Sequence, residues 1–169
     1  MLEGLDTVLL SWKVEFDLRV PNRKPICLPD FNTLPKNWQT CWLAGFGKTE
    51  TGTPPTTLKQ YPMKYYPLPK CAKFFKFAIS EFLRSHENTT CFNTDNEKSS
   101  TQCSGDSGGP AMCEVNGRYV LFGVVSMRIT KCGDSSAPAS FGGVSRFLPF
   151  MCCKMRVSER PVVCEGLCG

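Results

Sequence analysis

Eleven cysteines in 169 residues constrain the fold of this chain more than any other feature of its sequence. The chain has one histidine, no Cys-x-x-Cys pair and no Cys/His cluster with ligand spacing, which argues against a zinc module. Disulfides formed in an oxidising compartment fit this composition better. The triplet Asn88-Thr89-Thr90 is a glycosylation acceptor and agrees with export. The sequence therefore predicts a secreted or lumenal disulfide-bonded protein without a metal or another cofactor.

The remaining composition excludes two classes of partner. The net charge is +5, but the basic residues are scattered rather than gathered in a stripe, which argues against nucleic-acid binding. No segment approaches the roughly 20 apolar residues that span a bilayer. The first ten residues lack the basic and then apolar pattern of a signal peptide, so we expect the N-terminus to be truncated.

Prolines and glycines are spread through the chain between short apolar runs, which is typical of strands and loops. Residues 6–10 predict a short buried strand, and the proline-rich residues 21–35 predict a surface connection. Residues 41–47 predict an apolar strand whose glycines permit a close backbone approach. Asn116-Gly117 favours a tight turn between strands at 111–115 and 118–127. A mostly β protein with one core is the expectation.

One helix is predicted at about residues 71–84, where apolar side chains recur at helical spacing. Such a helix could lie on a membrane surface, but packing against its own domain is several times more common. Further along, Pro149 and the pair Cys152-Cys153 predict an interruption of any helix near the C-terminus.

The segment Gly105-Asp106-Ser107-Gly108-Gly109-Pro110 carries the clearest chemical signal. A serine hydroxyl becomes a useful nucleophile when it is exposed beside a base and near N–H donors that stabilise an oxyanion. The simpler alternative is a Gly/Pro turn that happens to contain Asp-Ser. The surrounding residues decide against that alternative, because Cys103, Cys113 and Cys132 lie at the spacing found in trypsin-like serine proteases. The resemblance covers nearly the whole chain.

This resemblance implies an all-β, trypsin-like double β-barrel with a nearly complete second barrel and a truncated first barrel. The expected parts are a first-barrel remnant at 1–20, an interbarrel connection at 21–38, the second barrel at 39–151 and a cysteine-rich tail at 152–169. Pro25-Ile26-Cys27-Leu28-Pro29 resembles the start of the family's crossing between barrels.

The resemblance also implies three disulfides, each of which closes a long loop. The implied pairs are Cys41 with Cys113, Cys71 with Cys91, and Cys103 with Cys132. Cys27 resembles the cysteine that ties the family's domain to an N-terminal light chain or propeptide. The pairing of the four tail cysteines stays open: Cys152, Cys153, Cys164 and Cys168.

By the same resemblance, Ser107 is the nucleophile, Asp6 is the triad aspartate, and Gly105 and Ser107 provide the oxyanion donors. Asp106 is similar to the residue that pairs with the new N-terminal amine after zymogen cleavage. The family's histidine precedes its aspartate, so we expect this chain to lack it and the triad to be incomplete. His86 is the only histidine, and we expect it on an exposed loop rather than beside Ser107.

Specificity follows from two further segments. Thr101 matches the floor of the primary specificity pocket, where cleavage after Lys or Arg would require aspartate. The wall that reads Ser-Trp-Gly in the family reads Ser126-Met127-Arg128 here. Because Arg128 replaces a glycine, we expect a narrow pocket that favours small or apolar residues.

Two functions are consistent with these observations. The first is a serine endopeptidase domain acting on polypeptides, inactive as these 169 residues alone and completed by a missing N-terminal protease segment. The second is a non-catalytic homologue that binds a protein partner through the old substrate cleft. Arg128 is the best sequence feature in favour of the second.

Overall fold

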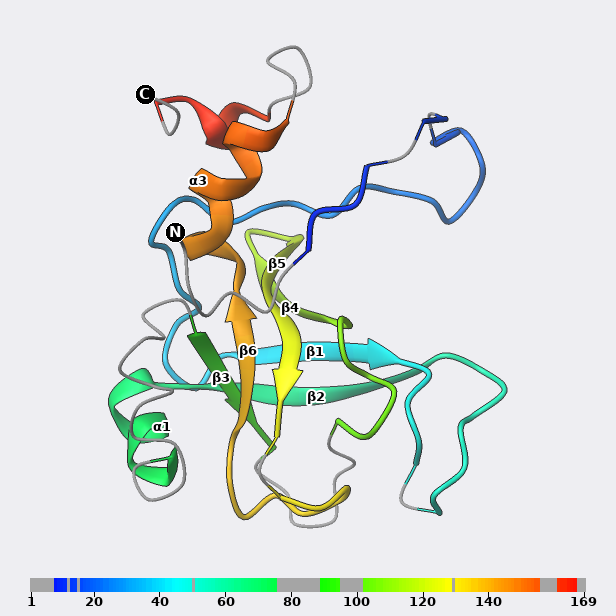
Figure 1. The fold of residues 1–169 in the computed structure, drawn as a ribbon, viewed down its shortest axis with the longest axis vertical. Coiled ribbons are helices and arrows are strands. Elements are labelled where there is room, and N and C mark those ends of the chain that lie inside the picture. The colour runs from blue at the N-terminus through cyan, green and yellow to red at the C-terminus, as the bar shows by residue number, and fades with distance from the viewer. Residues whose placement is uncertain are drawn as a thin grey trace.

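A computed structural model describes residues 8–11, 13–14, 16–49, 51–75, 89–94, 102–128, 130–155 and 161–166. Within these residues the chain forms one antiparallel barrel, and a helix rises from one end of it (Figure 1). No helix among the described residues is long and apolar enough to cross a bilayer.

Six strands close the barrel in the order β1-β2-β3-β6-β5-β4, and every neighbouring pair is antiparallel. The strands are β1 (Thr40–Gly45), β2 (Lys59–Tyr66), β3 (Thr89–Asn93), β4 (Pro110–Val115), β5 (Arg118–Met127) and β6 (Ala139–Gly143). The mostly β prediction is therefore confirmed for one barrel. The double-barrel architecture stays a prediction.

Alternating apolar residues fill the barrel interior, as expected for strands with one face toward a core. Leu43, Phe92 and Phe141 are fully buried, and the two phenylalanine rings pack edge to face with centroids 4.9 Å apart. Cys41 and Cys113 lie directly opposite each other on β1 and β4 and form a disulfide. The rigid β1–β4 pair thus supports the loop that precedes β4.

The predicted hairpin is confirmed. Asn116 and Gly117 both have positive φ, 51° and 74°, and connect β4 to β5. Glycine suits the second position because it adopts a left-handed conformation without steric cost.

Among the described residues the structure has two α-helices where the sequence predicted one. Helix α1 (Leu68–Phe75) begins before the predicted start, and residues 76–84 lie outside the described part of the chain. Helix α3 (Val144–Lys154) runs through Pro149, so the predicted interruption is wrong. A proline removes one hydrogen bond to the carbonyl four residues earlier. The buried face of α3 offsets that loss with Val144, Phe147, Leu148 and Cys152.

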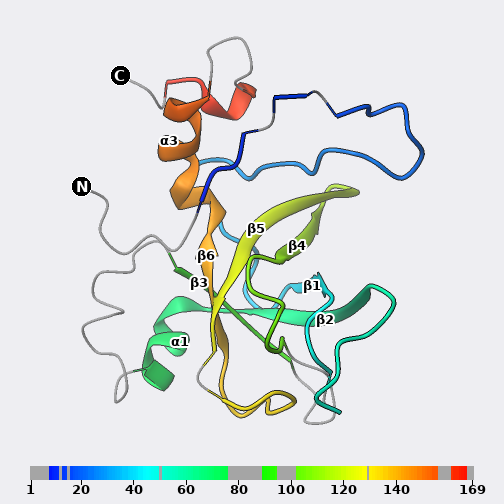
Figure 2. The ribbon, with the colours of Figure 1, turned by 45° about the vertical axis from the view of Figure 1, so that its right-hand side comes forward.

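The strand predicted at residues 6–10 is not formed by its described part. Residues 8–10 have no strand pairing, and the side chains of Val8 and Leu10 are 79% and 71% exposed. Figure 2 shows this N-terminal segment running away from the barrel. A strand needs a neighbour that satisfies its backbone groups, and no described strand lies beside this segment.

Disulfides tie the peripheral segments to the barrel. The structure contains the three pairs that the resemblance implies: Cys41–Cys113, Cys71–Cys91 and Cys103–Cys132. A fourth bridge, Cys152–Cys164, fastens the short helix η2 (Val162–Cys164) to α3, and Cys153 is also disulfide-bonded. Cys27 is the free cysteine of the described residues and lies beside Val120 of β5.

We expect Leu148→Ala to lower the free energy of unfolding by about 2–5 kcal/mol, because it empties a buried position under α3. Leu148 is fully buried beside Cys152 and Cys164. Val162→Ala is the matched control, since Val162 belongs to the adjacent η2 but is 79% exposed. Denaturant unfolding measures both; equal shifts would contradict the docked position of α3.

Candidate active site

The loop Gly105–Pro110 connects Cys103 to β4 and is held by backbone hydrogen bonds. The Asp106 N–H donates to the carbonyl of Cys103 (3.0 Å), and the Gly109 N–H donates to the carbonyl of Asp106 (2.9 Å). Two further bonds join the loop to the end of β5: Gly108 N to Val125 O (3.0 Å) and Val125 N to Gly109 O (2.9 Å). The loop therefore has a defined path beside two barrel strands.

Ser107 lies at the exposed part of this loop. Within the described residues, the backbone N–H groups of Gly105 and Ser107 donate no hydrogen bond, whereas those of Asp106, Gly108 and Gly109 do. Gly105 has φ 99°, a conformation that a side chain would strain. Two unused donors thus flank an exposed hydroxyl, an arrangement that suits an anion forming beside Ser107.

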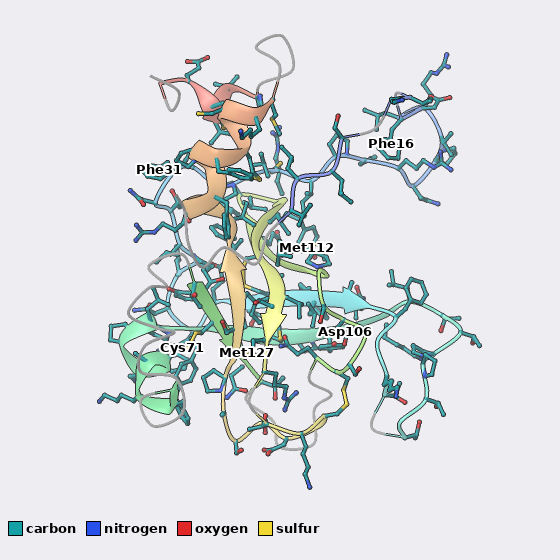
Figure 3. The ribbon with its side chains drawn as sticks, in the orientation of Figure 1. Phe16, Phe31, Cys71, Asp106, Met112 and Met127 are labelled. Carbon is teal, nitrogen blue, oxygen red and sulfur yellow. A yellow bond between two sulfur atoms is a disulfide. The ribbon has the colours of Figure 1, made fainter. Side chains whose placement is uncertain are left out.

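Asp106 turns away from the surface and is 4% exposed. Its Oδ1 accepts a hydrogen bond from Gly47 N (2.8 Å), and its Oδ2 accepts from Cys103 N (2.8 Å) and from Tyr61 Oη (2.8 Å). Figure 3 shows Asp106 against the end of β1 and β2. Neighbouring residues of one loop therefore face opposite environments, with a buried carboxylate next to an exposed alcohol.

Two glycines make room for the carboxylate. A Cβ built on Gly45 or on Gly47 would overlap the carboxyl group of Asp106. The glycines in residues 41–47 predict a close backbone approach, but Asp106 was not predicted as the group that approaches them. The Gly-x-Gly spacing at the end of a strand is the signal for this contact, because both positions share one face of the strand.

Tyr61 is a site residue that sequence reasoning missed. Burial, followed by its hydrogen bond to Asp106 and the charge of that carboxylate, raises the pKa of Tyr61 well above its ordinary value. The hydroxyl therefore stays protonated and donates to Asp106. Nothing local in the sequence pairs these residues, since they lie 45 positions apart.

Arg128 belongs to the predicted wall of the specificity pocket and contacts Gln102, which directly follows the predicted floor residue Thr101. Its Nη1 donates to the carbonyl of Gln102 (2.9 Å), its Nε donates to Thr130 Oγ1 (2.8 Å), and its Nη2 donates to the carbonyl of Asp134. Burial lowers the pKa of Arg128, while the nearby charge of Asp134 opposes that effect.

Gln102 is buried and makes a second contact with the end of β5, where its Nε2 lies 3.5 Å from the carbonyl of Met127. A cavity of about 10 Å³, roughly one water-sized sphere, lies beside Gln102 and Arg128 and is also lined by residues of the barrel, such as Met63, Phe92 and Ala139. Gln102 is a second missed residue, although it directly follows the predicted pocket floor.

The structure describes Gly105, Asp106 and Ser107 in one loop, and it joins Met127 and Arg128 of the predicted pocket wall to Gln102. The other residues singled out by the sequence lie outside the described part of the chain: Asp6, His86, Asn88 and Thr101. Among the described residues, no cluster of His, Cys, Asp and Glu side chains could hold a metal ion.

Comparisons with known proteins agree with this geometry. The family model described as Trypsin matches residues 3–151. The chain is 32% identical to rat (Rattus norvegicus) tissue-type plasminogen activator and 30% identical to spermosin from Halocynthia roretzi; these matches cover 72% and 76% of this chain. They cover 22% and 31% of those proteins, so the chain spans about a fifth to a third of these relatives.

A solved structure gives the same result. Neuropsin, a serine protease expressed in the limbic system of mouse brain, superposes with a TM-score of 0.64 and 28% identity, over 79% of this chain and 54% of the neuropsin chain.

We expect Asp106→Asn to lower the free energy of unfolding by about 2–3 kcal/mol, because an amide cannot accept hydrogen bonds from all three donors of a buried charged group. Glu114→Gln, an exposed carboxylate on β4, is the control and should change stability by less than about 0.5 kcal/mol. Chemical denaturation followed by near-UV circular dichroism measures both. An Asp106→Asn variant as stable as the unmodified chain would contradict the importance of the three hydrogen bonds to Asp106.

Proposed function

Because the chain belongs to the trypsin family of serine proteases, we propose that it is a serine-type endopeptidase domain in which Ser107 is the nucleophile. The observation that carries this proposal is the exposed Ser107, in a loop where the N–H groups of Gly105 and Ser107 donate no hydrogen bond to a described residue. The neighbouring Asp106 is buried. The substrates are polypeptides. The disulfides and the family together suggest an extracellular location.

In the proposed reaction, Ser107 Oγ attacks the carbonyl carbon of a peptide bond and its proton passes to an imidazole. The carbonyl π electrons move to oxygen, and the N–H groups of Gly105 and Ser107 stabilise that oxyanion. The C–N bond then breaks, the leaving amine takes the proton from the imidazolium, and water hydrolyses the acyl ester. Asp6 is the proposed partner of the imidazole.

We propose that the 169-residue chain alone is inactive, because its single histidine is not the family's triad histidine. His86 follows Asp6 in the sequence, whereas the family's histidine precedes the aspartate. The loop around Ser107 would then supply the nucleophile and the oxyanion donors, and the proton acceptor would come from another polypeptide segment.

The contacts of Arg128 support a restricted specificity pocket. The guanidinium donates to three oxygen acceptors, so hydrogen bonds fix its position, and in this proposal it narrows the specificity pocket. A domain with such a pocket would admit small or apolar residues, because Thr101, which the resemblance assigns to the pocket floor, lacks the carboxylate that a basic residue needs.

A non-catalytic homologue is the alternative, and the same contacts favour it. If Arg128 never leaves the pocket, no substrate side chain can anchor the scissile bond near Ser107. The domain would then bind a protein partner over the cleft surface without cleaving it.

We expect a fluorophosphonate probe to leave Ser107 of the isolated chain unlabelled, because no imidazole activates the hydroxyl. Fusing the part of the neuropsin domain that precedes the matched region should supply that imidazole and produce labelling. The control is the same fusion with Ser107→Ala. Labelling of the isolated chain would contradict its inactivity. An unlabelled but cooperatively folded fusion would instead support the non-catalytic alternative.

We expect Arg128→Ala to open the pocket to a small aromatic molecule such as indole. Binding, measured by NMR titration, should become about tenfold tighter than in the unmodified chain, which corresponds to about 1.4 kcal/mol. Arg118→Ala is the matched control, since Arg118 is an exposed arginine at the other end of β5. Equal affinity in both variants would show that Arg128 does not fill the pocket.

A further inference from the structure

The buried carboxylate of Asp106 has a donor that its family role does not require. By resemblance, Asp106 pairs with a newly formed N-terminal amine. Here its Oδ2 instead accepts a hydrogen bond from the hydroxyl of Tyr61 on β2, at 2.8 Å. Backbone N–H groups of Gly47 and Cys103 provide the other two donors, each at 2.8 Å.

We propose that Tyr61 is a positioning residue that holds Asp106 inside the barrel without a cationic partner among the described residues, and so keeps the peptide groups of Gly105 and Ser107 in an oxyanion-binding arrangement. The anchoring of Asp106 by Tyr61 stands on its own contacts. Its role in orienting oxyanion donors rests on the function proposed above.

The energetics of burial explain why the hydroxyl matters. A carboxylate removed from water is costly unless hydrogen bonds to its oxygens replace its hydration. Hydrogen bonds to a charged acceptor are stronger than neutral ones, and Asp106 receives three of them at 2.8 Å. The raised pKa of Tyr61 means that its hydroxyl keeps its proton, so this donor is always present.

The position of Asp106 in the loop explains how this anchor acts on the surface. Asp106 lies between Gly105 and Ser107, so the backbone torsions that turn its side chain inward also set the peptide groups on either side. Gly45 and Gly47 have no Cβ and so leave space for that inward orientation. Tyr61 reaches the same space from β2, which pairs with β1 through Leu43–Tyr61 and Gly45–Lys59.

A double-mutant cycle tests the anchor, with Tyr61→Phe, Asp106→Asn and the double variant studied by denaturant unfolding. Tyr61→Phe removes only the hydroxyl and should raise the unfolding equilibrium constant about 10- to 100-fold. In the Asp106→Asn background the same substitution should change it severalfold less. Tyr119→Phe, on a tyrosine that is 49% exposed, is the control and should change it less than about twofold. An equal effect of Tyr61→Phe in both backgrounds would overturn the anchor.

Backbone NMR tests the positioning role in the same full-length variants. Tyr61→Phe should shift the amide resonances of Gly105 and Ser107 and speed their hydrogen exchange, while the amide of Gly117 in the β4–β5 turn stays unchanged. Unchanged Gly105 and Ser107 amides in a destabilised variant would assign Tyr61 a purely structural role and overturn the proposal. Neither measurement needs a reactive serine, so a failed labelling of the neuropsin fusion would reject the endopeptidase function alone.

Discussion

The candidate site depends on one buried charge. Asp106 places a carboxylate inside the barrel wall, where it must be fully hydrogen-bonded to be tolerated, and its three donors come from three separate segments. Those segments are the end of β1, the strand β2 and the residue that carries the Cys103–Cys132 disulfide. The carboxylate thus links the exposed Ser107 loop to the rigid part of the domain.

The barrel supplies the rigidity that this link requires. β1 carries Gly45 at its end, pairs with β2 on one side and is joined to β4 on the other by the Cys41–Cys113 bridge. The loop before β4 is therefore supported where it meets β4, by the disulfide-linked strand pair and by backbone bonds to Val125 of β5. This support lets Gly105 and Ser107 keep unused N–H groups at the surface, an arrangement that active sites use to stabilise developing negative charge.

The predicted wall of the specificity pocket, which contains Arg128, is held by different contacts. Arg128 makes hydrogen bonds to Gln102, Thr130 and Asp134, which fix its guanidinium at the end of β5. In the proposed function the Ser107 loop would serve catalysis, whereas Arg128 would obstruct the specificity pocket. The two proposed functions differ in whether that obstruction moves.

Much of the fold could be predicted from local sequence. The spacing of Cys103, Ser107, Cys113 and Cys132 was enough to identify the family, and Asn116-Gly117 was enough to predict the hairpin, because turn chemistry depends on adjacent residues. The predictions failed where packing overrides local preference. Pro149 lies within α3 because the helix buries an apolar face and is bridged through Cys152, while residues 8–10 form no strand because no described strand lies beside them.

The sequence by itself determined the family, the disulfide-rich β character and the chemistry available at Ser107, since these follow from residue types at short and specific spacings. Only the tertiary structure decided which side chains and backbone groups contact Asp106 and Arg128. Tyr61 is 45 positions from Asp106, and Arg128 is 26 positions from Gln102. Contacts over such separations arise from strand register and loop paths, which no local pattern encodes.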